Sequence, residues 1–162
     1  MNILGLDLGT NCGYAYNVEG TFAVGTWVLG TDKEIKQWGK TRLTRRRDPR
    51  IERFCQLLGN LPPFDVLVFE DVQFASYTLQ VQLWSALRAT AWLCGTAKIW
   101  EAVPVSTLKA FATGSGAADK EHMATKLEKF YPKLWQPGLD DDAIDAIWLW
   151  LWAKKTLTRE KL

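Results

Sequence analysis

The pattern of apolar and polar residues predicts five β-strands. Each is a run of mostly apolar residues bounded by glycine, proline or polar residues, which is typical of strands in a packed sheet. The turn at residues 19–20 joins two of these runs into a hairpin. The five predicted strands are residues 3–8, 13–18, 21–29, 65–72 and 97–103.

Apolar residues at helical spacing predict five helices. The longest is residues 78–94, in which Leu79, Leu83 and Leu87 recur every four positions. Ser106 is predicted to be the N-cap of a short helix. The five predicted helices are residues 49–58, 78–94, 106–111, 119–130 and 140–156.

The order of these elements predicts the fold class. Three successive strands are followed by strands that alternate with helices. This order favours an α/β fold with a five-stranded mixed sheet, three antiparallel strands and then two parallel ones, flanked by helices. The length of 162 residues fits a single domain, 1–162. Apolar residues make up 48% of the chain, which excludes a disordered protein.

The sequence contains neither a membrane-spanning segment nor a paired-cysteine motif. The longest apolar run, residues 143–153, is broken only by Asp145 and is too short to cross a bilayer, and no signal-peptide pattern is present at the N-terminus. We therefore expect a cytoplasmic protein without a membrane partner, in the host cytoplasm if it is phage-encoded. Cys12, Cys55 and Cys94 are far apart and lack C-x-x-C spacing, so we expect three reduced thiols in the core.

Positive charge is concentrated in one stretch. Residues 36–53 contain eight basic and two acidic residues, so they carry +6, while the rest of the chain carries −4. Two interpretations are open: a contact with a polyanion such as DNA, or an ordinary solvated face. The candidate DNA contacts in this stretch are Arg42, Arg45, Arg46, Arg47 and Arg50.

Two carboxylates interrupt strands that are otherwise apolar. Asp7 lies between two leucines, and Glu70 lies near the end of the fourth strand. An ionised carboxylate removed from water is costly unless it is paired or binds a metal. If the two strands are neighbours in the sheet, both carboxylates reach its carboxyl end, where open α/β sheets bind ligands.

Two further carboxylates are predicted to approach the same place. Asp142 and Asp145 are three positions apart and therefore share one face of the last helix, whereas Asp140 and Asp141 are expected to form its N-terminus. Converging carboxylates repel one another unless a cation binds, and oxygen ligands select Mg²⁺ or Mn²⁺. Two such ions can activate water and stabilise the leaving oxygen of a phosphodiester, so the predicted chemistry is nucleic-acid hydrolysis.

Four segments together resemble a known family. "ILGLDLGTNCGYA", "VFEDVQFAS", "TLKAFATGSGAADKEHM" and "DDAIDAI", in this order and spacing, resemble the RuvC-type Holliday junction resolvases of the ribonuclease H-like superfamily, which act in DNA recombination and repair. The resemblance implies a Mg²⁺-dependent endonuclease that nicks four-way or other branched DNA, with two ions and with Mn²⁺ as a substitute. It implies that Asp7, Glu70, Asp142 and Asp145 are catalytic metal ligands and that Lys109 and Lys120 contact phosphate.

The resemblance also concerns partners. It implies a homodimer formed through helix 78–94, with Arg88 at the position of a family arginine, and a branch-migration motor is a further candidate partner. Gln73 stands where bacterial members carry an aromatic residue that wedges into the junction, and Phe74 follows it, so the wedge is either shifted or lost. The basic stretch and the many tryptophans suggest a divergent, phage-type branch.

Two other functions are weighed against the nuclease. A catalytically inert module that binds branched DNA would not need four carboxylates, because acidic groups repel a polyanion. The Asp-x-Gly-Thr turn at residues 7–10 also resembles the phosphate loop of actin-like and sugar-kinase ATPases, but those folds need a second, related half.

Overall fold

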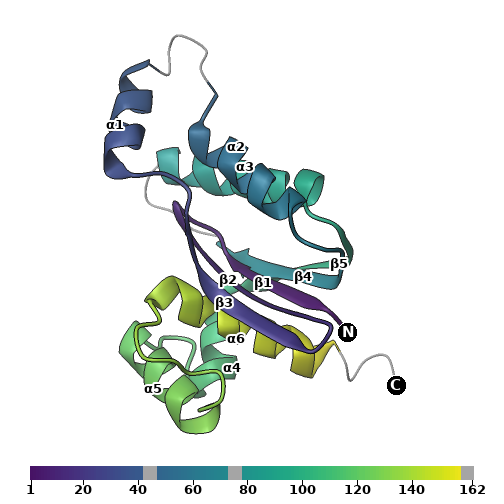
Figure 1. Ribbon diagram of the computed structural model, residues 1–162. Coiled ribbons are helices and arrows are strands. Elements are labelled where there is room, and N and C mark those ends of the chain that lie inside the picture. The colour runs from purple at the N-terminus through teal and green to yellow at the C-terminus, as the bar shows by residue number, and fades with distance from the viewer. Residues whose placement is uncertain (42–46, 73–77, 158–162) are drawn as a thin grey trace.

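The protein, described here by a computed structural model at residues 1–41, 47–72 and 78–157, is built on one mixed sheet. The strand order is β3-β2-β1-β4-β5 (Figure 1). The first three strands pair antiparallel, and β1, β4 and β5 run parallel, as the order of elements predicts. The strands are β1 (Ile3–Asp7), β2 (Asn11–Val18), β3 (Thr21–Val28), β4 (Phe64–Asp71) and β5 (Ala97–Pro104).

Helices cover both faces of the sheet (Figure 1). Helices α2 and α3 pack on one face, and α6 packs on the other with α4 and α5 beside it. None of the helices in the described residues is long and apolar enough to cross a bilayer. The helices are α1 (Asp32–Thr41), α2 (Pro49–Gly59), α3 (Thr78–Cys94), α4 (Val105–Thr113), α5 (Lys120–Phe130) and α6 (Asp141–Thr156).

One helix was not predicted, and one predicted N-cap is wrong. Helix α1 was not predicted, although its N-terminus carries a capping box in which Thr31 N donates to Glu34 (2.8 Å) and Glu34 N donates to the Thr31 hydroxyl (3.3 Å). Ser106 is not an N-cap, because α4 begins one residue earlier, after Pro104, without a side-chain cap. Pro104 lies just before the helix, where its missing backbone N–H removes no helical hydrogen bond.

The prediction of three reduced thiols is also wrong. Cys55 on α2 and Cys94 at the end of α3 form a disulfide with a Cα–Cα distance of 5.3 Å, and only Cys12 is a free, buried thiol among the described residues. The two cysteines are 39 positions apart. Their contact depends on how α2 packs against α3, which their spacing in the sequence does not reveal.

Candidate active site

Strand alternation directs Asp7 and Glu70 toward the same face of the sheet. On β1, Ile3 packs in the core on the α6 side, while Leu4 and Leu6 pack on the α2–α3 side. Asp7 is four residues after Ile3 and therefore points toward α6. On β4, Val66 and Val68 likewise face α6, so Glu70, two residues after Val68, points toward α6 as well. The parallel register of β1 and β4 makes the two carboxylates neighbours.

Two glycines allow α6 to approach the sheet closely. Gly13 on β2 pairs with Asp7, and a Cβ added to Gly13 would lie 1.9 Å from the Asp142 carbonyl oxygen. A Cβ on Gly5 would lie 2.6 Å from the Ala146 carbonyl oxygen. Any larger residue would therefore push α6 away, and with it the carboxylates that it carries.

The N-cap of α6 fixes the helix to β3. Asp140 accepts a hydrogen bond from Ala143 N (2.9 Å), as expected of an N-cap, and a second from the Thr26 hydroxyl (2.6 Å). Thr26 is paired with Gly13 in the β2–β3 ladder. Asp140, Thr26 and the glycines position the site without being candidates for chemistry. This role could not be predicted from the sequence, because it depends on contacts between distant segments.

The four predicted carboxylates influence one another's ionisation. Burial, followed by the charges of Glu70, Asp145 and Asp142, raises the pKa of Asp7 well above its usual range. Burial and the charge of Asp145 raise the pKa of Glu70 to about 7, and burial raises that of Asp145 to about 6. Burial also raises the pKa of Asp142, whose side chain hydrogen-bonds that of Asp7. The structure therefore brings together all four residues of the predicted acidic site.

This donor set fits a hard divalent cation. A cation among the carboxylates would relieve both their repulsion and the cost of burying their charges. Within the ranges that the structure describes, no three acidic, histidine or cysteine side chains lie close enough to form a complete metal-ligand set. The carboxylates would therefore have to move closer together to surround an ion.

Two lysines border the carboxylates, as predicted. Lys109 lies on α4, and its charge lowers the pKa values of Glu70 and Asp145, which burial raises. Lys120 is the first residue of α5, and its Nζ lies 3.1 Å from an Asp141 carboxylate oxygen. Lys120 is exposed and also lowers the pKa of Asp7. Both cations therefore lie where they can contact an anion that approaches the acidic site.

The predicted DNA contacts have different surroundings. Arg50 binds Asp48 and Thr10 through three hydrogen bonds, so most of its donors are occupied. Arg88 pairs with Asp71 at 3.2 Å and stacks on Trp92. Arg47 is exposed. The other predicted contacts lie outside the described residues, and they are Arg42, Arg45, Arg46, Gln73 and Phe74.

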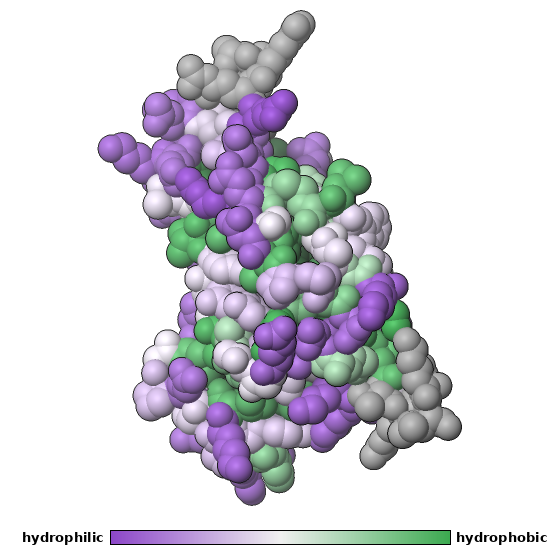
Figure 2. Space-filling view, turned by 45° about the vertical axis from the view of Figure 1, so that its right-hand side comes forward, coloured by the Kyte–Doolittle hydropathy of each residue, from purple (hydrophilic) through white to green (hydrophobic). Residues whose placement is uncertain are grey.

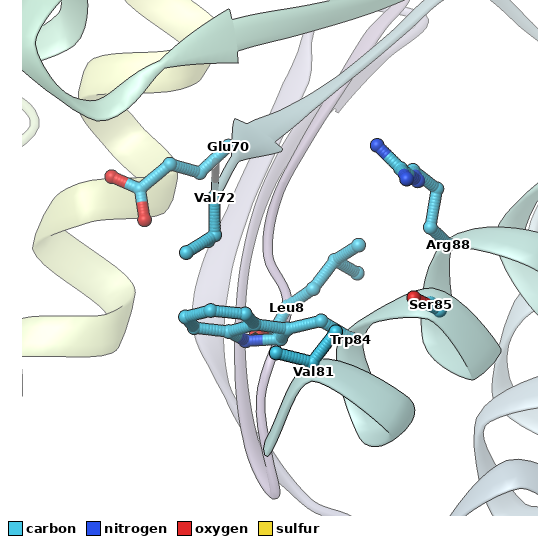
Figure 3. A pocket seen from close by; sticks show the side chains of 7 residues that line it. All are labelled: Leu8, Glu70, Val72, Val81, Trp84, Ser85 and Arg88. Carbon is cyan, nitrogen blue, oxygen red and sulfur yellow. The ribbon is translucent and has the colours of Figure 1, made fainter. Parts of the chain in front are cut away.

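A small hollow separates Glu70 from α3 (Figure 3). Its volume is about 130 Å³, and Arg88 and Trp84 line its α3 side. In Figure 3 the Glu70 carboxylate points away from Trp84, toward α6. The Trp84 indole donates a hydrogen bond to the Leu8 carbonyl oxygen (2.9 Å), one residue after Asp7. Helix α3 is thereby attached directly to the chain that leaves the acidic site.

The mixed α/β sheet with the strand order β3-β2-β1-β4-β5 has a ribonuclease H-like fold. Among solved structures, the chain is similar to RuvC of Thermus thermophilus, with a TM-score of 0.57, 18% identity and 98% of each chain covered. It is also similar to T. thermophilus RuvC in complex with a Holliday junction substrate (TM-score 0.61, 17% identity, 98% of this chain and 97% of that one). The yeast mitochondrial Holliday junction resolvase Ydc2 matches with a TM-score of 0.52 and 12% identity, over 91% of this chain and 75% of that one.

The fold is that of the RuvC-like Holliday junction resolvases, which confirms the resemblance at the level of structure. Comparisons with protein-family models and with curated proteins give no match.

Proposed function

We propose that this protein is a metal-dependent endonuclease that nicks four-way junctions or other branched DNA by phosphodiester hydrolysis. The observation that carries the proposal is the convergence of four carboxylates from β1, β4 and α6 within a resolvase fold. Their raised pKa values indicate a site that is unfavourable without a bound cation. Such an acidic cluster would weaken DNA binding in a protein that only bound DNA, because carboxylates repel phosphates.

Asp7, Glu70, Asp142 and Asp145 would hold the metal, with two Mg²⁺ ions as the expected occupancy and Mn²⁺ as a substitute. When bound, the metal would activate a water molecule and stabilise the leaving oxygen. Lys109 and Lys120 would bind the scissile phosphate, because both face the acidic site from α4 and α5. A lysine ammonium group is a compact charge that also stabilises the extra negative charge of the transition state.

A homodimer formed through α3 belongs to the same proposal. Val81 and Trp92 are 43% and 53% exposed, and with Ser85 and Arg88 they form one stripe along α3. Large exposed apolar side chains on one helix face are typical of an interaction surface. A two-fold axis at this stripe would place two active sites in the symmetric arrangement that paired nicks in a four-way junction require.

The proposal is tested with a labelled synthetic four-way junction and a linear duplex of matched sequence, in Mg²⁺ and in chelator. We expect symmetric nicks in the junction only, lost in chelator and in Asp7→Asn. Asp32→Asn, an exposed aspartate on α1, is the matched control and should cleave normally. Full activity of Asp7→Asn would refute the proposal. Junction binding without metal-dependent nicking by the wild type would instead support an inert binding module, and ATP turnover would support the ATPase alternative.

A further inference from the structure

Glu70 lies at the end of β4, beyond the last pair that this strand forms with β1. Among the described residues, the β1–β4 register ends at the pair Leu6–Phe69, whereas the β4–β5 register continues to Asp71, which lies opposite Pro104. Proline has no backbone N–H and donates no hydrogen bond to a neighbouring strand. The position of the last residues of β4 therefore depends strongly on side-chain contacts.

Both sequence neighbours of Glu70 are bound by α3. Side chains alternate along a strand, so Phe69 and Asp71 point toward α3 while Glu70 points toward α6. The buried Phe69 ring contacts Trp92 edge-on, with 6.4 Å between the ring centres. Arg88 Nη1 donates a hydrogen bond to an Asp71 carboxylate oxygen (3.2 Å). Contacts directly before and directly after Glu70 therefore fix the strand that carries it.

The residues of α3 that make these contacts lie in one row. The Arg88 guanidinium group lies 5.6 Å from the centre of the Trp92 ring, one helical turn further along α3. Trp84, one turn before Arg88, donates to the carbonyl oxygen of Leu8, the residue after Asp7. Three side chains at four-residue spacing therefore contact the ends of both strands that carry a carboxylate of the acidic site.

Arg88 binds the neighbour of Glu70 and not the Glu70 carboxylate itself. Figure 3 shows the Arg88 guanidinium group and the Glu70 carboxylate on opposite sides of the end of β4. The cations that lower the pKa of Glu70 are Lys109 and Lys120, on α4 and α5. An influence of Arg88 on Glu70 would therefore pass through the backbone of residues 69–71.

The contacts lie at the surface and add little to the core. The side chains of Arg88 and Asp71 are 40% and 25% exposed, and Trp92 is exposed as well. Figure 2 shows hydrophobic surface among hydrophilic side chains in the half of the molecule that carries α2 and α3. An ion pair that water reaches contributes little to stability. Its removal should leave the fold intact, so positioning of the site can be separated from stability.

We propose that Arg88 and Trp92 are positioning residues for Glu70, which fix the end of β4 so that the Glu70 carboxylate can join the other three around a metal ion. The inference rests on the proposed function, because it assumes that the acidic site binds a divalent cation. The sign of the effect distinguishes positioning from simple electrostatics. Loss of a cation near the site should strengthen binding of a divalent ion, whereas misplacement of a ligand should weaken it.

The test measures Mn²⁺ binding to the protein without DNA by isothermal titration calorimetry. We expect Arg88→Ala to weaken Mn²⁺ binding about tenfold, the lower end of what loss of a residue that orients a metal ligand causes. Arg88→Lys keeps the charge opposite Asp71 and should recover part of the affinity. Lys98→Ala removes the ion pair with Asp65 (2.7 Å) at the other end of β4, and as the matched control it should bind Mn²⁺ as the wild type does.

Further variants identify the route of the effect. Asp71→Asn breaks the same contact without changing α3, so adding it to Arg88→Ala should cause little further loss. Trp92→Ala should also weaken Mn²⁺ binding, and Trp92→Phe, which keeps a ring beside Phe69, should weaken it less. In a Glu70→Gln background, Arg88→Ala should change Mn²⁺ affinity by less than about twofold, because no carboxylate remains to be positioned.

Three results would overturn the proposal. They are unchanged or tighter Mn²⁺ binding by Arg88→Ala, unchanged binding by Trp92→Ala, and a loss in Arg88→Ala that persists at full size in the Glu70→Gln background. The last result would mean that Arg88 supports the fold or another ligand. Nicking is measured separately, so wild-type protein that binds Mn²⁺ through this arrangement without cleaving branched DNA would refute the nuclease and leave the positioning role standing.

Discussion

Replacing Glu70 with glutamine should stabilise the metal-free protein at alkaline pH. Folding raises the pKa of Glu70 from 4.5 to about 7, because the side chain is buried and faces the charge of Asp145. The folded protein therefore binds a proton more tightly than the unfolded chain does. Stability then falls as pH rises between these two values, and the full cost is reached only above pH 7, where Glu70 is ionised in both states.

The expected change in the free energy of unfolding follows from the pKa shift of Glu70. Each pKa unit corresponds to about 1.4 kcal/mol, so ionised Glu70 costs the folded state about 3 kcal/mol above pH 7. Glutamine has nearly the same shape and no charge. We therefore expect Glu70→Gln to raise the free energy of unfolding by up to about 3 kcal/mol at pH 8.5 and by less than about 1 kcal/mol at pH 5.

The measurement is urea unfolding of wild type and variant at pH 5 and pH 8.5, in chelator and without reductant. Glu128→Gln, at an exposed position on α5, is the matched control and should shift the unfolding free energy little at either pH. Adding Mg²⁺ at pH 8.5 should stabilise the wild type more than Glu70→Gln, because the cation performs the same neutralisation. An equal effect at both pH values, or destabilisation at pH 8.5, would refute the reasoning, since either result would mean that Glu70 is not held in a repulsive, buried cluster.

Two further predictions concern the framework of the site. Gly13→Ala should abolish nicking and destabilise the protein by about 2 kcal/mol or more, because the added Cβ would overlap the Asp142 carbonyl oxygen. The control is Gly59→Ala, where an added Cβ meets nothing within 4 Å. Normal nicking by Gly13→Ala would contradict the close approach of α6 to the sheet. Reductant should lower the unfolding free energy of the wild type by about 4 kcal/mol, because the disulfide between Cys55 and Cys94 closes a loop with a sequence separation of 39 residues. The unfolding free energy of Cys55→Ser should not change with reductant. Insensitivity of the wild type to reductant in urea unfolding would show that the disulfide contributes nothing.

The placement of the acidic residues could be predicted from the sequence because it depends on local pattern. Asp7 and Glu70 stand out as charges in apolar strands, and the period of two along a strand decides the face to which each points. The three-residue spacing of Asp142 and Asp145 likewise decides their shared helix face. Each of these inferences needs only a few neighbouring residues and the identity of the secondary structure.

The parts that could not be predicted depend on contacts between distant segments. Gly13 has no local signature that distinguishes it from an ordinary strand glycine, and only the packed α6 shows why a Cβ is excluded there. The disulfide requires the relative placement of α2 and α3. Helix α1 is different, because the Thr31–Glu34 capping box was present in the sequence. It was missed because the basic residues that follow dominated the interpretation of this segment.

Contacts from both faces of the sheet determine the position of Asp7. On the α6 side, Gly13 and the bond between Asp140 and Thr26 set how closely the other carboxylates approach it. On the opposite side, the loop that follows Asp7 is held by Trp84 at the Leu8 carbonyl oxygen and by Arg50 at the Thr10 hydroxyl. Trp84 and Arg50 therefore hold residues 8–10 from the side of the sheet opposite α6. Loss of either contact should move the loop after Asp7, and with it the Asp7 carboxylate, even though neither side chain belongs to the acidic cluster.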